Sequence, residues 1–391
     1  MQTLSDFYDL MAKTVTVRRM LVEFYLAGTV KLEEIAALRN ACKALEELCD
    51  DEGNYEFLTK PGGKRISIPL DYEVEELEKD IFFFEHGESA FFRYTADRLP
   101  QLEQHMAAIK DLLRPAGGAT FITDRDGTVN NYCGRYRSSV QSAYNAIHLT
   151  RFARARAGAA LILTSAPLED FGLVNLSVLP ENTFMMAGSK GREFRDAGGA
   201  RHTLPIEPAK EELLERFNNR LSQLLQSPDY EEFSVIGSAV QFKFGQTTVA
   251  RQDMHGSIPS QRSEEFLERV RALVAELDPT GDTLRIEDTG YDIEIILTRE
   301  QGDRDFNKGD GVAFVDQVAG LELGGRTVVC GDTSSDLPMV REAAAKSDDV
   351  RVVFVTQDEN LKREVEQHAP QSVFVDYPDA LVLALGELAK E

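Results

Sequence analysis

The sequence predicts an α/β fold: a Rossmann-like parallel sheet with an inserted α+β segment and an N-terminal helical extension. Three observations predict this fold. Short β-rich runs alternate with helix-like stretches in two separated parts of the chain, which is the pattern of a parallel sheet. The stretch between these two parts alternates like antiparallel strands. The residues that precede all of them have helical periodicity.

The length of the chain, 391 residues, predicts two or three domains, because single cores rarely grow beyond about 250 residues. A hydrophobic fraction of 42% is enough to fill such cores. Changes of pattern along the chain set the expected boundaries: a helical domain over 1–116, a first part of the core over 117–195, an insertion over 196–299 and a second part of the core over 300–391.

The N-terminal segment shows the helical pattern most clearly in KLEEIAALRNACKALEELC, where apolar residues recur every three or four positions from Leu32 to Cys49. The sequence PGGK at 61–64 interrupts the pattern, which resumes through EVEELEKDIFFFEHGESAFFRY. We expect the phenylalanines of that stretch to be core residues and not a binding surface. The segment carries no recognisable chemical motif.

The core pattern begins with ATFITD and GAALILTS, two buried strand runs separated by a helix-like stretch near 138–157. It returns near the C-terminus as RTVVCGD, the helix-like LPMVREAAAK, VRVVFVT, a further helix and QSVFVDY. The insertion holds the strand-like SVIGSAVQFKFGQTTVARQ and YDIEIILT, with helix-like EELLERFNNRLSQLL and SEEFLERVRALVAEL. We therefore expect a parallel α/β sheet interrupted by an α+β insertion.

The charge excludes some partners. Acidic residues outnumber basic ones 66 to 43, a formal net charge of −23. Nucleic acids and anionic lipid surfaces would repel such a protein unless it carried a concentrated basic patch, and no run of Lys and Arg is long enough. No stretch approaches about 18 consecutive apolar residues, and the N-terminus lacks an apolar signal segment. We expect a soluble, cytoplasmic protein that binds neither nucleic acid nor membrane.

The strongest chemical feature is the run Asp124-Arg125-Asp126-Gly127-Thr128, directly after the first strand run. Ligands bind at the carboxyl ends of strands in such sheets, and the glycine lets the chain bend so that both carboxylates can face one pocket. Two anions this close cost energy unless a cation lies between them or one is protonated. A hard cation such as Mg²⁺ prefers oxygen ligands and meets this need. The alternative is an Asx-type turn that closes the strand.

Other polar residues follow neighbouring strand runs. Asp332 and Asp336 follow RTVVCG, and Thr164 and Ser165 end the run ALIL. Lys308 precedes a helix-like stretch that leads toward Asp332. Each of them alone could be a helix cap or a solvated side chain. Together, at one edge of a parallel sheet, carboxylates, a hydroxyl and a lysine suit Mg²⁺-assisted phosphoryl transfer.

This order and spacing resembles the haloacid dehalogenase (HAD) superfamily of phosphotransferases over residues 118–391. The resemblance implies a Rossmann-like HAD core, Mg²⁺ and an aspartyl-phosphate intermediate. It implies that Asp124 is the nucleophile and that Asp126 is the general acid and base. Thr164 would hydrogen-bond the transferring phosphoryl group, and Lys308 would neutralise its charge.

The resemblance also implies a metal site. Asp332 would complete it together with the carboxylate of Asp124 and the backbone carbonyl of Asp126. Asp336 would hold Lys308 or a metal-bound water in place. The expected catalytic residues are therefore Asp124, Asp126, Thr164 and Lys308, and the expected metal residues are Asp124, Asp126, Asp332 and Asp336.

The position of the insertion, after Thr164 and before Lys308, resembles the members with a C2-type cap, in which the cap covers the substrate. Several segments look like those of trehalose-6-phosphate phosphatases: AGSKGRE at 187–193, VQFK at 240–243, the following strand to Arg251, and IEI at 293–295. The substrate-binding residues that this resemblance implies are Ser165, Gly188, Ser189, Lys190, Glu193, Gln241, Lys243, Arg251 and Glu294. They would bind the sugar of a small glycosyl phosphate.

Three positions depart from that pattern. Lys190 stands where the family has histidine, Gln241 where it has glutamate, and Ala166 where it has the arginine of SGR. These changes favour a different glycosyl phosphate. The helical extension, together with the run from Asp124 to Arg135, looks most like the glucosylglycerol-phosphate phosphatases of salt-tolerant bacteria. The first prediction is therefore hydrolysis of glucosylglycerol 3-phosphate to glucosylglycerol and phosphate.

Two other functions stay open. A trehalose-6-phosphate phosphatase is favoured by the cap segments and disfavoured by the changes at Lys190 and Gln241. A phosphatase-fold scaffold is the second, with residues 1–115 binding a partner such as the synthase that makes the substrate. The excess of acidic residues could serve solubility, or it could be an adaptation to a salty cytoplasm. A role in the synthesis of a compatible solute favours the second explanation.

Overall fold

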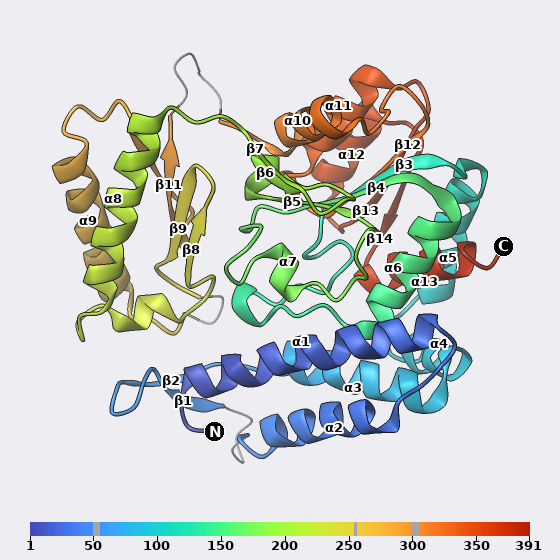
Figure 1. The fold of residues 1–391 in the computed structure, drawn as a ribbon, viewed down its shortest axis with the longest axis horizontal. Coiled ribbons are helices and arrows are strands. Elements are labelled where there is room, and N and C mark those ends of the chain that lie inside the picture. Colours follow the sequence, from blue (N-terminus) through green and yellow to red (C-terminus); the bar gives the residue numbers. More distant parts are fainter. Residues whose placement is uncertain (50–54, 254–255, 299–304) are drawn as a thin grey trace.

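The computed structural model describes residues 1–49, 55–253, 256–298 and 305–391. It confirms the α/β prediction: a central, mainly parallel sheet, a smaller antiparallel sheet and an N-terminal bundle of helices (Figure 1). The N-terminal helices lie beneath both sheets in this view. Helix α1 (Leu4–Leu26) packs against helices of the central-sheet domain, and its Tyr8 hydroxyl donates to the carbonyl of Val235 at 3.4 Å, so the bundle contacts both parts of the molecule.

The N-terminal domain consists of helices and one short hairpin. The helices are α1 (Leu4–Leu26), α2 (Leu32–Glu46), α3 (Asp71–His86), α4 (Glu88–Ala96) and α5 (Leu102–Leu113), and the strands are β1 (Glu56–Leu58) and β2 (Arg65–Ser67). A capping box starts α1: the Thr3 hydroxyl accepts the amide of Asp6, whose carboxylate accepts the amide of Thr3. Phe83 and Phe91 are fully buried, as predicted. The hairpin was not predicted, and PGGK forms its turn.

The central sheet has the strand order β14-β13-β12-β3-β4-β5-β6-β7. Its strands are β3 (Ala119–Thr123), β4 (Ala157–Leu163), β5 (Met185–Gly188), β6 (Glu193–Arg195), β7 (Arg201–Thr203), β12 (Thr327–Gly331), β13 (Val350–Val355) and β14 (Ser372–Val375). Pairing is parallel from β14 to β5 and antiparallel beyond β5. All five residues of β3 are buried, as expected for a central strand that is covered on both faces.

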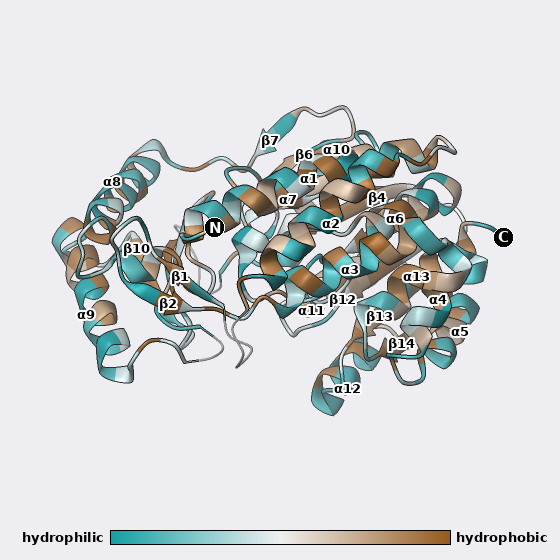
Figure 2. Ribbon diagram, turned by 90° about the horizontal axis from the view of Figure 1, so that it is seen from below, coloured by the Kyte–Doolittle hydropathy of each residue, from teal (hydrophilic) through white to brown (hydrophobic). Residues whose placement is uncertain are grey.

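Helices cover both faces of this sheet. They are α6 (Ala143–Arg156), α7 (Leu173–Leu176), α10 (Lys308–Ala319), α11 (Leu337–Lys346), α12 (Glu359–His368) and α13 (Pro378–Leu388). On one face, Phe121 and Val353 share a core with α6, α13 and the N-terminal helices. On the other, Ile122 and Val352 pack with α10, α11 and α12. Helix α13 is hydrophobic along most of its length, because it is buried between the bundle and the sheet (Figure 2).

The smaller sheet has the order β10-β11-β9-β8 and is antiparallel throughout. It comprises β8 (Val240–Lys243), β9 (Gln246–Ala250), β10 (Leu284–Asp288) and β11 (Asp292–Leu297), with helices α8 (Pro208–Leu225) and α9 (Ser260–Leu277). Val249, Ile293 and Ile295 form a core with the two helices. The residues between them in the strands, such as Thr248 and Glu294, face the other way because side chains alternate along a strand. We call this unit the cap.

One boundary differs from the sequence-based expectation. Strand β7, within the expected insertion of 196–299, pairs with β6 and extends the central sheet. We therefore propose that the cap begins after Thr203 and not at residue 196. The pairing in the central sheet changes from parallel to antiparallel between β5 and β6, shortly before residue 196.

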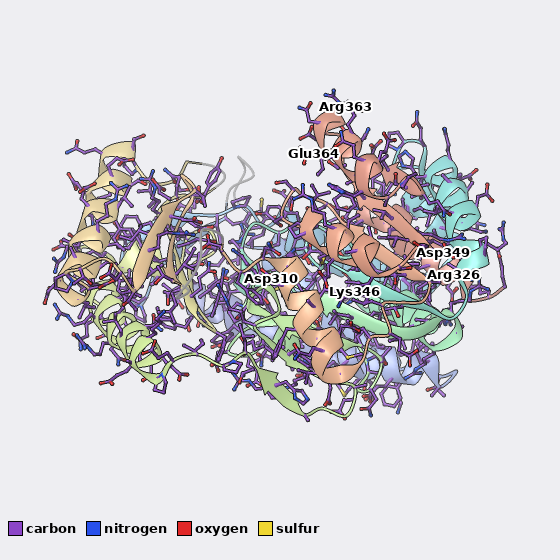
Figure 3. The ribbon with its side chains drawn as sticks, turned by 90° about the horizontal axis from the view of Figure 1, so that it is seen from above. Asp310, Arg326, Lys346, Asp349, Arg363 and Glu364 are labelled. Atoms are coloured by element: carbon purple, nitrogen blue, oxygen red, sulfur yellow. The ribbon has the colours of Figure 1, made fainter. Side chains whose placement is uncertain are left out.

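Charged side chains cover the exposed helices, in line with the net charge. Arg363 and Glu364 of α12 point away from the body of the molecule, and Arg326 pairs with Asp349 at 2.6 Å (Figure 3). Among the residues that the structure describes, no helix is both long and apolar enough to cross a membrane.

Candidate active site

The predicted catalytic residues meet at the carboxyl edge of the three adjacent strands β12, β3 and β4. Asp124 directly follows β3, Thr164 follows β4 and Asp332 follows β12. Lys308 is the first residue of α10, whose cap residue Asn307 accepts the amides of Gly309 and Asp310. Because strand ends and a capped helix start are fixed backbone positions, the four side chains are held by rigid elements.

Lys308 is almost completely buried and lies between two carboxylates. Its Nζ donates to Asp124 Oδ1 at 2.6 Å and to Asp336 Oδ1 at 2.5 Å. Burial opposes the positive charge of Lys308, but the two aspartates raise its pKa above the usual lysine value. Lys308 is therefore a permanent cation at the carboxyl edge of the sheet.

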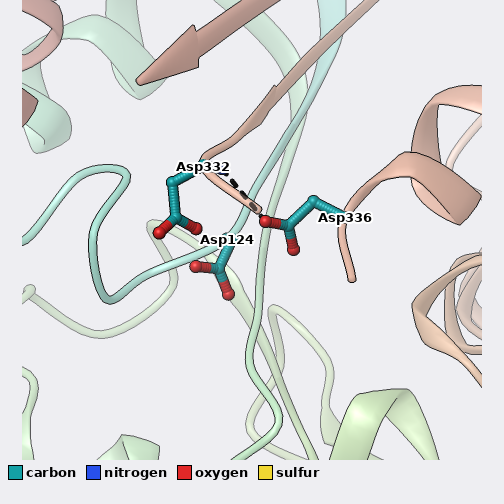
Figure 4. A group of neighbouring side chains, drawn as sticks. All are labelled: Asp124, Asp332 and Asp336. Carbon is teal, nitrogen blue, oxygen red and sulfur yellow. Dashed lines mark hydrogen bonds between the residues drawn. The ribbon is translucent and has the colours of Figure 1, made fainter. Parts of the chain in front are cut away.

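The three carboxylates of Asp124, Asp332 and Asp336 offer oxygens that lie within 4.8 Å of one another (Figure 4). Burial raises the pKa of Asp124 to about 7, against the opposing effect of Lys308. Burial, together with the charges of Asp124 and Asp336, raises the pKa of Asp332 to about 9. Three carboxylates beside one lysine, two of them buried and that of Asp332 half-buried, leave an excess of negative charge that a hard divalent cation would neutralise. The donor set thus fits Mg²⁺.

Asp336 differs from the other two because protein donors occupy both of its oxygens. Lys308 donates to Oδ1, and the amides of Asp332 and Thr333 donate to Oδ2 at 3.0 Å each. Although burial opposes it, the Lys308 charge and these hydrogen bonds lower the pKa of Asp336. Asp336 therefore holds Lys308 and the loop of Asp332 in place, as one of the two predicted roles requires.

Gly127 shows why the motif contains glycine. Its φ is +87°, and a Cβ placed there would lie 2.2 Å from Asp332 Oδ2. A side chain at this position would be strained and would also displace the carboxylate of Asp332. The turn after β3 and the acidic cluster thus depend on each other.

Asp126 is held by its neighbours on the following loop. Its Oδ1 accepts from Arg125 at 2.7 Å and from Ser139 at 2.8 Å. Arg125 is 1% exposed, so it is a buried partner of Asp126 and not a solvated side chain. Arg135 is likewise buried and pairs with Glu73 at 2.8 Å.

A cavity of about 280 Å³ lies between the core and the cap. Of the residues predicted from sequence, those that line it are Asp124, Asp126, Thr164, Ser165, Gln241, Lys243, Glu294, Lys308 and Asp332. The lining also includes residues that sequence reasoning missed: Tyr136, Ser139, Ser238, Thr248 and Asp292. Strand alternation could have found two of them, since Thr248 pairs with Gln241 and Glu294, and Asp292 is two residues from Glu294.

Two lysines bring positive charge to the cap side of the cavity: Lys243 from β8 of the cap and Lys190 from the core, between β5 and β6. Burial lowers the pKa of Lys243 to about 8, and the nearby Glu294 only partly offsets this effect. The Nζ of Lys190 lies 3.9 Å from Glu294 Oε2. Glu294 thus stands between the two lysines, and the cap surface of the cavity combines donors and acceptors of both charges.

Five predicted substrate-binding residues do not line the cavity within the described part of the chain: Gly188, Ser189, Lys190, Glu193 and Arg251. The Ser189 hydroxyl donates to Glu193 Oε1 at 2.8 Å and accepts the amide of Phe244 at 2.9 Å. It thus joins the core to the β8–β9 turn.

Contacts within the fold explain why Gly188, Glu193 and Arg251 do not line the cavity. Glu193 also accepts the amide of Leu168 at 3.2 Å, and a Cβ on Gly188 would lie 2.4 Å from that nitrogen. Arg251 pairs with Glu264 at 2.8 Å and with Asp288 at 2.9 Å inside the cap. These side chains are therefore used within the fold in this structure.

Two family models match the chain. The model described as "Trehalose-6-phosphate phosphatase, C-terminal" matches residues 121–381. The model described as "Trehalose-6-phosphate phosphatase N-terminal helical bundle domain" matches residues 3–102. Together they span the helical domain and the part of the chain that carries the cavity.

Curated relatives have related names. A Caenorhabditis elegans protein named alpha,alpha-trehalose-phosphate synthase (UDP-forming) 2 is 31% identical over 414 residues, which are 99% of this chain and 33% of that relative. A Brugia malayi protein named trehalose-phosphatase is 28% identical over 429 residues, which are 100% of this chain and 86% of that relative. The chain thus spans about a third of the length of the synthase. A solved structure described as a trehalose-6-phosphate phosphatase related protein matches 69% of this chain and 97% of its own, with 14% identity and a TM-score of 0.48.

The names of the matching family models and relatives can be compared with the substrate predicted from sequence. Both family models and both relatives name trehalose, whereas the first prediction from sequence was glucosylglycerol 3-phosphate. That prediction gains no support, and the alternative that the sequence left open fits better. Of the two departing residues, Gln241 lines the cavity and Lys190 pairs with Glu294.

Proposed function

The chain belongs to the trehalose-6-phosphate phosphatase family, and from this premise we propose that it is a Mg²⁺-dependent phosphoric monoester hydrolase whose substrate is trehalose 6-phosphate. One observation carries the proposal of activity: Asp124, Asp126, Lys308 and Asp332 line one cavity, with Lys308 2.6 Å from Asp124. This is the set that phosphoryl transfer through a carboxylate needs.

The reaction has two displacements. In the first, an oxygen of Asp124 attacks phosphorus, the bond from phosphorus to the sugar oxygen breaks, and Asp126 gives its proton to the leaving alcohol. In the second, Asp126 takes a proton from water, the resulting hydroxide attacks phosphorus, and Asp124 and inorganic phosphate are released. Lys308 and the Thr164 hydroxyl stabilise the phosphoryl oxygens throughout.

The carboxylates of Asp124 and Asp332, with the backbone carbonyl of Asp126, would hold the metal ion. When bound, Mg²⁺ supplies positive charge to the phosphoryl oxygens. Asp336 keeps Lys308 charged and oriented.

The cap side of the cavity supports a sugar as the remainder of the substrate. Gln241, Lys243 and Glu294 present amide, ammonium and carboxylate groups, and Ser238, Thr248 and Asp292 add hydroxyl and carboxylate groups. Sugar hydroxyls both donate and accept, so a wall of mixed donors and acceptors suits them. The proposal of trehalose 6-phosphate over glucosylglycerol 3-phosphate rests on the family.

A panel of phosphate esters tests the proposal. Trehalose 6-phosphate, glucosylglycerol 3-phosphate and glucose 6-phosphate are compared by phosphate release, with Mg²⁺ and with EDTA. We expect the highest kcat/KM for trehalose 6-phosphate, loss of turnover with EDTA, and none with Asp124→Asn. A preference for glucosylglycerol 3-phosphate overturns the substrate alone. Turnover by Asp124→Asn overturns the nucleophile, and no hydrolysis of any ester overturns the function.

The similarity to one third of a synthase chain supports a partner as well. We propose that this phosphatase acts beside a trehalose-phosphate synthase, which would supply its substrate. Sedimentation of the purified chain with and without such a synthase tests this. Independent sedimentation at micromolar concentrations contradicts it and leaves the phosphatase activity untouched.

A further inference from the structure

The loop that follows the nucleophile, residues 129–142, packs against α3 of the helical domain. Glu73 pairs with Arg135 through two contacts of 2.8 Å. Glu76 accepts from Asn131 at 2.8 Å and from the hydroxyl of Ser142. None of these contacts is needed for the chemistry proposed above, and yet they fix the loop that carries the partners of Asp126.

A hydrogen-bonded path leads from this helix to Asp126. The hydroxyl of Tyr72 donates to the carbonyl of Val140 at 3.0 Å and accepts from Asn130 Nδ2 at 2.9 Å. Asn130 Nδ2 lies 3.2 Å from the hydroxyl of Ser139, which donates to Asp126 Oδ1 at 2.8 Å. Tyr72 is thus connected to the proposed acid and base through two side chains.

Tyr72 is half-buried, and the two side chains that connect it to Asp126 are shielded from water. Asn130 and Ser139 are each 1% exposed. Burial, with the charge of Glu76, raises the pKa of Tyr72 well above the usual value, so its hydroxyl stays a donor. Breaking one of these hydrogen bonds would leave a further unpaired group in a medium of low dielectric constant, where Asn130 Oδ1 already lacks a partner among the described residues. The direction of the Asp126 carboxylate is therefore set partly from the helical domain.

We propose that the N-terminal helical domain is part of the catalytic assembly, with Tyr72 as a positioning residue that orients Asp126 through Asn130 and Ser139. This inference rests on the proposed function, since it concerns the proton that Asp126 gives to the leaving alcohol. If the Asp126 carboxyl group points away, the reaction is slower, because in the transition state this group must lie within hydrogen-bonding distance of the leaving oxygen.

The leaving group distinguishes this role from a structural one. A sugar alkoxide needs a proton as it departs, whereas p-nitrophenolate is a good leaving group and departs without one. For Tyr72→Phe we expect kcat for trehalose 6-phosphate to fall about tenfold with KM unchanged, part of the 10²–10⁴-fold that general acid catalysis supplies. The rate of the first p-nitrophenol release from p-nitrophenyl phosphate should stay within about twofold of wild type.

Ser139→Ala removes the donor next to Asp126 and should show the same selective loss, which keeps the test valid if Tyr72→Phe folds poorly. Two variants serve as matched controls. Tyr25→Phe removes another hydroxyl of the helical domain, one that donates to Glu88 at 2.9 Å. Ser138→Ala removes the adjacent buried hydroxyl, which donates to the carbonyl of Arg135 at 3.3 Å. Both controls should leave the two rates as in wild type.

The outcomes separate the inference from the proposed function. An equal loss on both esters, or no loss on either, overturns the positioning role while the phosphatase activity stands. Loss in the control variants equal to that in Tyr72→Phe also overturns it. A wild-type chain that hydrolyses no sugar phosphate overturns the proposed function, and the inference with it.

Discussion

The helical domain meets the core and the cap in two very different ways. Toward the core, its charged side chains are buried against partners on the nucleophile loop and α13. Toward the cap, the β1–β2 hairpin meets residues 231–235 through lysines that remain half-exposed. Both members of each ion pair are thus buried on the core side, whereas on the cap side the lysine of each pair remains solvated.

The core-facing interface is built from buried charges. Glu73 and Arg135 are paired at 2.8 Å with side chains 0% and 8% exposed. Lys79 and Asp379 are paired at 3.1 Å with side chains 6% and 2% exposed. Removing one partner of such a pair leaves the other buried and unpaired, which typically costs about 3–5 kcal/mol. This interface is therefore hard to open.

The cap-facing interface pairs solvated lysines with glutamates whose side chains are only 8% and 7% exposed. Lys60 pairs with Glu231, and Lys64 pairs with Glu232 at 2.9 Å, but the two lysines are 52% and 47% exposed. Pairs of this kind contribute about 1 kcal/mol or less and weaken with salt. The difference indicates that the helical domain is fixed to the core and only tethered to the cap. Of the two walls of the cavity, the cap wall is then the one free to move.

The buried interface can be broken by Glu73→Ala, which leaves the Arg135 guanidinium buried without its partner. We expect the free energy of unfolding to fall by about 3–5 kcal/mol, measured by urea unfolding followed by circular dichroism. Glu56→Ala is the matched control, because it breaks an ion pair with Arg65 whose side chains are 51% and 72% exposed. A loss below about 1 kcal/mol for Glu73→Ala would show that the interface is not what fixes the domain.

Sequence reasoning found the core wall of the site and missed this interface for a physical reason. Asp124, Thr164 and Asp332 end strand runs, so their meeting follows from the rule that parallel strands end at one edge. Glu73, Glu76 and Asp80 recur at helical spacing on α3, where a polar stripe normally faces solvent. Their burial depends on partners far away in the chain, which helical periodicity cannot reveal.

The cap wall was predicted only in part, and for a related reason. Gln241, Lys243 and Glu294 were found because they lie in strand segments that resemble those of the family. Glu193 and Arg251 lie in such segments too, but they are satisfied by partners within the fold. A resemblance indicates which strand contributes to the cavity, and the partners of each side chain decide whether it lines the wall.

Lys243 can report the position of the cap. Its pKa is low because the side chain is buried, and we expect that burial to be lost when the cap moves away from the core. At a pKa of about 8, Lys243 is charged below this pH and loses its charge as the pH rises through it. Since the substrate is an anion, we expect kcat/KM for trehalose 6-phosphate to fall about tenfold per pH unit well above pH 8. Lys243→Arg should remove this limb, because arginine stays protonated.

Lys243→Met is the complementary variant, because its side chain is uncharged at every pH. At pH 7 it should have the low kcat/KM that wild type reaches only at high pH, and it should show no further decline due to this group. If wild type and Lys243→Arg decline together above pH 8, another group causes the limb. The cap would then not bury Lys243 during turnover.

The smallest effect is expected at the tether. The double variant Lys60→Ala, Lys64→Ala should lower the free energy of unfolding by about 1 kcal/mol or less, because both lysines are already solvated. Its cap should nevertheless detach more often, which amide hydrogen exchange at residues 232–235 would show as faster exchange in low salt. Raising the salt toward 1 M, where the Debye length is about 3 Å, should bring wild type to the rate of the variant.

Lys346→Ala is the control for this test, since Lys346 pairs with Asp316 and Glu342 at 3.0 Å and is 37% exposed, but lies on the core. It should leave both the exchange at 232–235 and its salt dependence as in wild type. Equal salt dependence in wild type and in the double variant would mean that charges other than Lys60 and Lys64 hold the cap. The exposed interface would then be incidental, and the contrast with the buried one would rest on the core side alone.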